Sequence, residues 1–129
     1  METRTADAGV LVVDDQEAFR QTAAALVAET PGLHVCRTAA TVADARLALA
    51  AGSIGVVLLD VRMPGEDPLG FAAGLRGSRP DVVVVLVSAY GVLDVPPALL
   101  ESGVGFVAKE ALAPESLLAA IDAARAGPR

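Results

Sequence analysis

Residues 54–65 read IGVVLLDVRMPG, an apolar run broken only by Gly55 and followed by Asp60 and a loop. The run does not alternate between polar and apolar side chains, which is typical of a strand covered on both faces in a parallel sheet. Val10–Val13 and Val82–Val87 have the same short, β-branched, apolar character. The sequence therefore predicts a parallel sheet with these three segments as its central strands.

Two weaker strand candidates, Leu33–Thr38 and Gly105–Ala108, complete a set of five. Segments with helical spacing separate the strands, and we expect helices over residues 16–29, 41–50, 68–76, 96–102 and 114–126. Asp15 is expected to cap the first helix, and Thr41 with Asp44 forms a capping-box-like start of the second. Strands and helices therefore alternate along the chain.

This alternation predicts an α/β fold of the (βα)5 type. Right-handed crossovers between parallel strands give a doubly wound, five-stranded sheet, and the flavodoxin-like strand order 2-1-3-4-5 is the economical solution for this length. The chain has 129 residues, of which 53% are hydrophobic, and we expect residues 1–129 to form a single domain. In such a sheet, ligands bind at the carboxyl ends of the strands.

Composition and charge exclude several classes of function. The net charge of -6 argues against direct binding of nucleic acid, which requires clustered Lys and Arg. The single cysteine, Cys36, excludes an internal disulfide framework. The apolar runs are shorter than the roughly 18 residues that a membrane-spanning helix needs, so no membrane segment is expected. The segment from Met1 to Ala8 lacks the pattern of a signal peptide, which favours a cytoplasmic protein.

Polar side chains fall where the predicted strands end. Asp14 and Asp15 follow the first strand, Asp60 the third, Ser88 the fourth and Lys109 the fifth. Each has an ordinary interpretation alone, as a turn residue, a helix cap or a solvated charge. Together they would bring three carboxylates to one edge of the sheet, where their repulsion requires a cation. The oxygen ligands favour Mg²⁺, and a carboxylate held beside Mg²⁺ and a lysine can attack phosphorus, for which Asp60 is the best candidate.

Four motifs at these strand ends resemble those of response regulator receiver domains, the CheY-like superfamily. They are Val12–Asp15, Leu58–Gly65, Val87–Ala89 and Phe106–Lys109. The resemblance covers essentially the whole chain, which would make residues 1–129 one receiver domain. The segment before Lys109 and the C-terminal residues also resemble the receiver half of LuxR-type regulators.

The resemblance implies a role for each matching position. Asp60 would be the phosphoacceptor, contacted by Lys109, and Ser88 with Phe106 would form the switch pair. The direct Mg²⁺ ligands would be Asp15, Asp60 and the backbone carbonyl of Arg62, and Asp14 would act through water. Phosphorylation would move Ser88 and Phe106 and repack the face formed by helix 96–102, strand 105–108 and helix 114–126.

The chain departs from the family pattern at two positions, and two further residues are expected to affect the lifetime of the phosphoryl group. Glu110 replaces the proline that often follows the lysine in a cis peptide, so we expect a trans bond here. Phe106 stands where tyrosine is common. Arg62 and Tyr90 are expected to flank the approach of water to the acceptor, and neither is suited to orient that water. We therefore expect slow autodephosphorylation.

The function implied is a regulatory switch in two-component signalling rather than an enzyme acting on an external substrate. Its only chemistry would be its own phosphorylation and autodephosphorylation. The partner implied is a sensor histidine kinase. The resemblance also allows a homodimer formed on phosphorylation, and a DNA-binding output domain beyond Arg129 that regulates transcription.

Two other classes of protein share parts of this pattern. A haloacid-dehalogenase-type hydrolase also uses an aspartyl nucleophile with Mg²⁺, but it usually needs an acid two residues later, where this chain has Arg62. A flavodoxin-like FMN carrier would need a hydroxyl- and glycine-rich phosphate loop after the first strand, where this chain has Asp14 and Asp15. Absorbance near 450 nm in the purified protein would favour the carrier.

Overall fold

The apolar segments predicted as central strands lie in the middle of the sheet. The structure is a computed structural model that describes residues 8–128. The strands are β1 (Ala8–Val13), β2 (Leu33–Ala39), β3 (Val56–Asp60), β4 (Val83–Ser88) and β5 (Gly105–Ala108). They pair in parallel in the order β2-β1-β3-β4-β5, which confirms the predicted topology. Every residue of β3 and β4 is buried, whereas β2 and β5 are partly exposed edge strands, which explains their weaker sequence signal.

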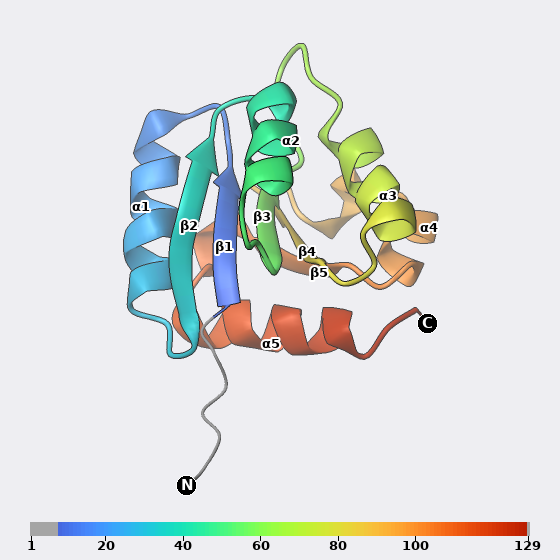
Figure 1. Ribbon diagram of the computed structural model, residues 1–129. Coiled ribbons are helices and arrows are strands. Elements are labelled where there is room, and N and C mark those ends of the chain that lie inside the picture. The colour runs from blue at the N-terminus through green and yellow to red at the C-terminus, as the bar shows by residue number, and fades with distance from the viewer. Residues whose placement is uncertain (1–7, 129) are drawn as a thin grey trace, which may run out of the picture.

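Helices cover both faces of this sheet (Figure 1). The helices are α1 (Glu17–Ala28), α2 (Val42–Ala51), α3 (Pro68–Ser78), α4 (Pro97–Glu101) and α5 (Pro114–Arg125). Side chains of α1 and α5, such as Val27 and Leu117, pack on one face of the sheet. Side chains of α2, α3 and α4, such as Leu49, Phe71 and Leu99, pack on the other. The two apolar layers cover both faces of the strands and leave the strand ends free to carry polar groups.

The starts of the helices test the predicted caps. The Thr41 hydroxyl accepts a hydrogen bond from the Asp44 amide at 3.0 Å, so the predicted cap of α2 is confirmed. The prediction that Asp15 caps α1 is wrong: Gln16 occupies the cap position and makes no capping bond with its side chain. The carboxylate of Asp14 instead accepts the Gln16 amide at 2.8 Å. Asp15 is therefore left exposed at the strand end.

The segments after β4 and β5 contain short turns that the sequence did not predict. Two 3-10 turns, η1 (Val92–Asp94) and η2 (Lys109–Ala111), precede α4 and α5. Helix α4 has five residues, shorter than predicted, because it begins after Pro96 and the chain turns at Gly103 with φ of 101°. No cis peptide bond occurs in residues 8–128, so the Lys109–Glu110 bond is trans as predicted.

The structure bears on the expectation about membrane segments but not on the expectation about a signal peptide. None of the helices between residues 8 and 128 has the length and apolar character needed to cross a bilayer. The N-terminal pattern used to argue against a signal peptide lies mostly in residues 1–7, outside the described residues.

Candidate functional site

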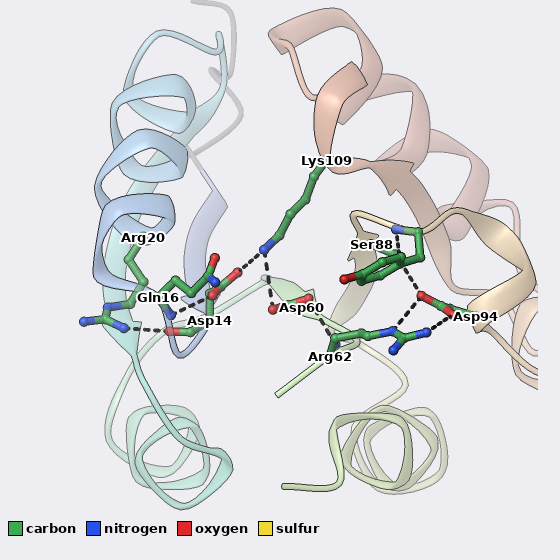
Figure 2. Close-up of polar contacts among 9 residues, drawn as sticks. Asp14, Gln16, Arg20, Asp60, Arg62, Ser88, Asp94 and Lys109 are labelled. Carbon is green, nitrogen blue, oxygen red and sulfur yellow. Dashed lines mark hydrogen bonds and ion pairs between the residues drawn. The ribbon is translucent and has the colours of Figure 1, made fainter. Parts of the chain in front are cut away.

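The residues predicted at the strand ends meet at one edge of the sheet. Asp60 is the last residue of β3 and Ser88 the last of β4, while Asp14 and Lys109 directly follow β1 and β5. Because these strands are adjacent and parallel, their carboxyl ends lie side by side, and Figure 2 shows Lys109 reaching toward Asp14 and Asp60. Residues that are far apart in the sequence thus form one cluster at the edge of the sheet.

Lys109 joins the two buried carboxylates. Its Nζ lies 2.9 Å from Oδ2 of Asp14 and 3.5 Å from Oδ2 of Asp60. Asp14 is fully buried and Asp60 is only 4% exposed, so a single ammonium compensates only part of two charges that have little contact with water. The same Nζ lies 4.2 Å from the centre of the Phe19 ring on α1, a cation–π contact that helps to position it.

Asp14 is held by α1 as well as by Lys109. Its Oδ1 accepts the Gln16 amide, and its backbone carbonyl accepts Nη1 of Arg20 at 2.7 Å. Its Oδ2 is buried and accepts no hydrogen bond within residues 8–128, although it forms the ion pair with the Lys109 ammonium. Such an oxygen remains available to a further positive group or a metal-bound water.

Asp60 is a buried acid with an altered pKa. Burial raises the pKa of Asp60 from 3.8 to about 6, against the opposing effect of the Arg62 backbone N–H, which donates to Oδ1 at 3.1 Å. The negative charge of Asp14 also raises this pKa, and Lys109 lowers it. The carboxylate is therefore poorly compensated by the protein alone, which favours binding of a cation beside it.

Three carboxylates are close enough to share a metal ion. One oxygen from each of Asp14, Asp15 and Asp60 can be chosen so that all lie within 4.8 Å of one another. Hard oxygen donors, one of them exposed and accessible, suit Mg²⁺ or a similar divalent cation. The donor set thus fits the ion predicted from the sequence. The part assigned to the Arg62 carbonyl stays a prediction.

Asp94, which was not among the residues predicted from the sequence, contacts two of them. The Ser88 hydroxyl donates to Oδ2 of Asp94 at 2.7 Å. Arg62 donates to both oxygens of the same carboxylate, from Nε at 3.2 Å and from Nη2 at 2.9 Å (Figure 2). Arg62, and to a lesser degree Ser88, lower the pKa of Asp94. The only sequence signal was an acid in the loop after β4, at the edge where ligands bind.

The two residues predicted to flank the acceptor lie against each other. The guanidinium carbon of Arg62 is 4.2 Å from the centre of the Tyr90 ring, although both side chains are largely exposed. The backbone N–H of Tyr90 also donates to the Ser88 hydroxyl at 3.0 Å. Arg62 and Tyr90 thus contact each other close to Ser88, the predicted switch serine.

Phe106, the predicted switch aromatic, lies on β5 opposite Leu86 of β4. It is partly buried and packs against the core on the α2–α4 side of the sheet. It also lines a groove with Val92 of η1 and Leu100 of α4, which extends across β5 to α5. The role of Phe106 as a switch aromatic stays a prediction.

The comparisons with known proteins agree with this geometry. Residues 10–122 match the response regulator receiver domain family. Among solved structures, the receiver domain of the putative response regulator NarL from Mycobacterium tuberculosis is 30% identical, with a TM-score of 0.75. The superposition covers 94% of this chain and 98% of that domain.

Two curated relatives carry the matching segment within longer proteins. Response regulator UvrY from Escherichia coli (strain CFT073) is 27% identical over 120 residues, which are 93% of this chain and 55% of UvrY. A protein-glutamate methylesterase/protein-glutamine glutaminase from Anaeromyxobacter dehalogenans is 37% identical over a gapped alignment of 131 positions. The alignment covers 92% of this chain and 36% of that protein. The chain therefore spans about half of one relative and about a third of the other.

Proposed function

This chain belongs to the response regulator receiver domain family of two-component signalling, and from that premise we propose that Asp60 accepts a phosphoryl group and thereby switches the protein. The observation that carries the proposal is a buried carboxylate at a sheet edge, 3.5 Å from the Lys109 ammonium and grouped with two further carboxylates. The family match favours this function over the hydrolase and the FMN carrier considered from the sequence.

The proposed reaction is a phosphoryl transfer from the phosphohistidine of a sensor kinase. An oxygen of the Asp60 carboxylate attacks phosphorus, the new O–P bond forms as the P–N bond breaks, and the imidazole leaves with the electron pair and takes up a proton. Lys109, which lies between Asp14 and Asp60, would bind a phosphoryl oxygen. The Ser88 hydroxyl would donate to another.

We assign Mg²⁺ to the cluster of Asp14, Asp15 and Asp60. Asp15, Asp60 and the Arg62 backbone carbonyl would be the direct ligands, and Asp14 would hold the ion through a water molecule. When bound, the ion would neutralise charge on the phosphoryl group during transfer. The residues of the chain fix the carboxylates in place through the α1 start and Lys109.

Output switching would follow from the new charge on Asp60. A phosphoryl group adds negative charge and strong acceptor oxygens, which attract Ser88 and Lys109 from β4 and β5. Movement of Ser88 would give Phe106 room to repack and would change the face formed by α4, β5 and α5. The phosphorylated form then favours one of two pre-existing arrangements.

We propose a sensor histidine kinase as the phosphodonor, with the domain acting in the cytoplasm. Homodimerisation on phosphorylation and a DNA-binding output domain beyond Arg129 belong to the same proposal. The relatives support an output module, because UvrY and the methylesterase are both much longer than the matched segment. Within this chain, we propose no enzymatic activity other than self-directed phosphotransfer and dephosphorylation.

Labelling with acetyl phosphate in the presence of Mg²⁺ tests the phosphoacceptor. We expect a mass increase of one phosphoryl group on the parent protein and its loss in Asp60→Asn, because the amide is not a nucleophile. Asp81→Asn is the matched control, since Asp81 is an exposed acid paired with Arg79. Equal labelling of Asp60→Asn would show that another residue is the acceptor.

A further inference from the structure

The switch hydroxyl already has an acceptor in this structure. The hydroxyl of Ser88 carries one proton, and it donates that proton to Oδ2 of Asp94 at 2.7 Å. The backbone N–H of Tyr90 donates to the same Ser88 oxygen at 3.0 Å. Ser88 is therefore oriented from both sides. Its single proton cannot be given to a second acceptor without leaving Asp94.

Asp94 is itself held firmly in place. Arg62 pairs with both of its oxygens, and only 17% of the Asp94 side chain is exposed. Its backbone N–H closes the η1 turn by donating to the carbonyl of Gly91 at 3.2 Å. Gly91 has a φ of 100°, a conformation that suits glycine and turns the chain back toward β4. The turn thus presents a carboxylate to a serine six residues earlier.

We propose that Asp94 is a positioning residue that holds the Ser88 hydroxyl and thereby opposes the phosphorylated arrangement. This inference rests on the proposed function, because the competitor for the hydroxyl is the phosphoryl group on Asp60. A phosphoryl oxygen and the Asp94 carboxylate both attract the same proton, so one bond must break before the other forms. The strength of the Ser88–Asp94 bond then sets how far the unmodified protein resists switching.

Binding of beryllofluoride with Mg²⁺, a non-covalent mimic of the phosphoryl group, measures this competition. We expect Asp94→Ala to bind beryllofluoride roughly two- to tenfold more tightly than the parent, the range for removing one net hydrogen bond. Asp94→Asn keeps a weaker, neutral acceptor and should lie between the two. Asp94→Asn also tests the competition on its own if the alanine variant does not fold.

Asp81→Ala is the matched control. It removes a carboxylate that likewise pairs with Nε and Nη2 of one arginine, Arg79, but does not touch Ser88. Its affinity for beryllofluoride should equal that of the parent. Arg62→Ala, which spares the Ser88–Asp94 bond, should tighten binding less than Asp94→Ala does.

The Ser88→Ala background separates positioning from a merely structural role. If Asp94 acts through the Ser88 hydroxyl, Asp94→Ala should no longer change the affinity when Ser88 is also alanine. A loosened η1 turn would instead change the affinity in both backgrounds. Unchanged or weaker binding by Asp94→Ala and Asp94→Asn, or an equal effect in the Ser88→Ala background, overturns the role of Asp94.

Failure of the proposed function gives a different result. If the parent does not bind beryllofluoride, or if Asp60→Asn binds it as well as the parent, the phosphoacceptor assignment fails and the role of Asp94 falls with it. Binding by the parent alone, without a gain in the Asp94 variants, overturns only the inference about Asp94.

Discussion

At the scale of single residues, Arg62 links Asp60, the proposed acceptor, to the loop after β4. Its backbone N–H donates to Asp60, and its side chain pairs with Asp94 and lies over the Tyr90 ring. This large side chain has two partners and belongs to the second residue after the proposed acceptor, and it carries no carboxylate or amide that could orient a water molecule. Water should therefore reach the phosphorus slowly.

This arrangement predicts the lifetime of the phosphoryl group. We expect phospho-Asp60 to decay several-fold faster in Arg62→Ala and in Tyr90→Ala than in the parent, because each change opens the approach of water. Arg79→Ala is the matched control, since Arg79 also pairs with one aspartate through two nitrogens but lies elsewhere. Decay is followed after removal of the phosphodonor with Mg²⁺ present. Unchanged or slower decay in both variants would exclude shielding.

At the scale of elements, the central strands could be predicted and the irregular turns could not. β3 and β4 are buried throughout, so their residues must be apolar and their ends are marked by the first polar side chains, Asp60 and Ser88. The parallel order then places those ends together. Asp94 lies in a short 3-10 turn, whose direction depends on contacts with Arg62 and Ser88 rather than on a repeating pattern. Nothing in the local sequence indicated those contacts.

The contact of β5 with α5 gives a prediction at this scale. A Cβ on Gly105 would lie 2.5 Å from the carbonyl oxygen of Ala120, so Gly105→Ala must push α5 away from the sheet. We expect it to lower the free energy of unfolding by about 1–3 kcal/mol, as overpacking does. Because β5 and α5 form part of the proposed output face, amide shifts should spread along α5.

Gly74 on α3 provides the matched control for that substitution. Nothing lies within 4 Å of a Cβ built there, and the residue is exposed within a helix. Gly74→Ala should therefore raise the free energy of unfolding by up to about 1 kcal/mol, because alanine favours the helix. Urea unfolding measures both variants. A Gly105→Ala protein as stable as the parent would mean that α5 adjusts to the added methyl group without loss.

At the scale of the whole molecule, the site concentrates negative charge in a chain that already carries a net charge of -6. Two of its carboxylates are buried and share one lysine. The pKa of Asp60 is raised from 3.8 to about 6, so between these pH values the folded protein binds more protons than the unfolded chain. In the metal-free protein, the contribution of Asp60 to stability therefore falls as the pH rises through about 6.

A bound cation should offset the loss of stability that ionised Asp60 causes at neutral pH, because Mg²⁺ needs the ionised carboxylate and binds the folded state. At a Mg²⁺ concentration ten times its Kd we expect a gain of about 1.4 kcal/mol in the free energy of unfolding at pH 7.5. At pH 5 the gain should be smaller, since protons compete for Asp60. Urea unfolding in EDTA and in MgCl₂, at matched ionic strength, gives the difference at each pH.

Asp60→Asn should be more stable than the parent in EDTA at pH 7.5, because it buries no charge, and it should lose most of the Mg²⁺ gain. The control Asp81→Asn should keep the full gain, and an equal gain in Asp60→Asn would place the cation away from the strand ends.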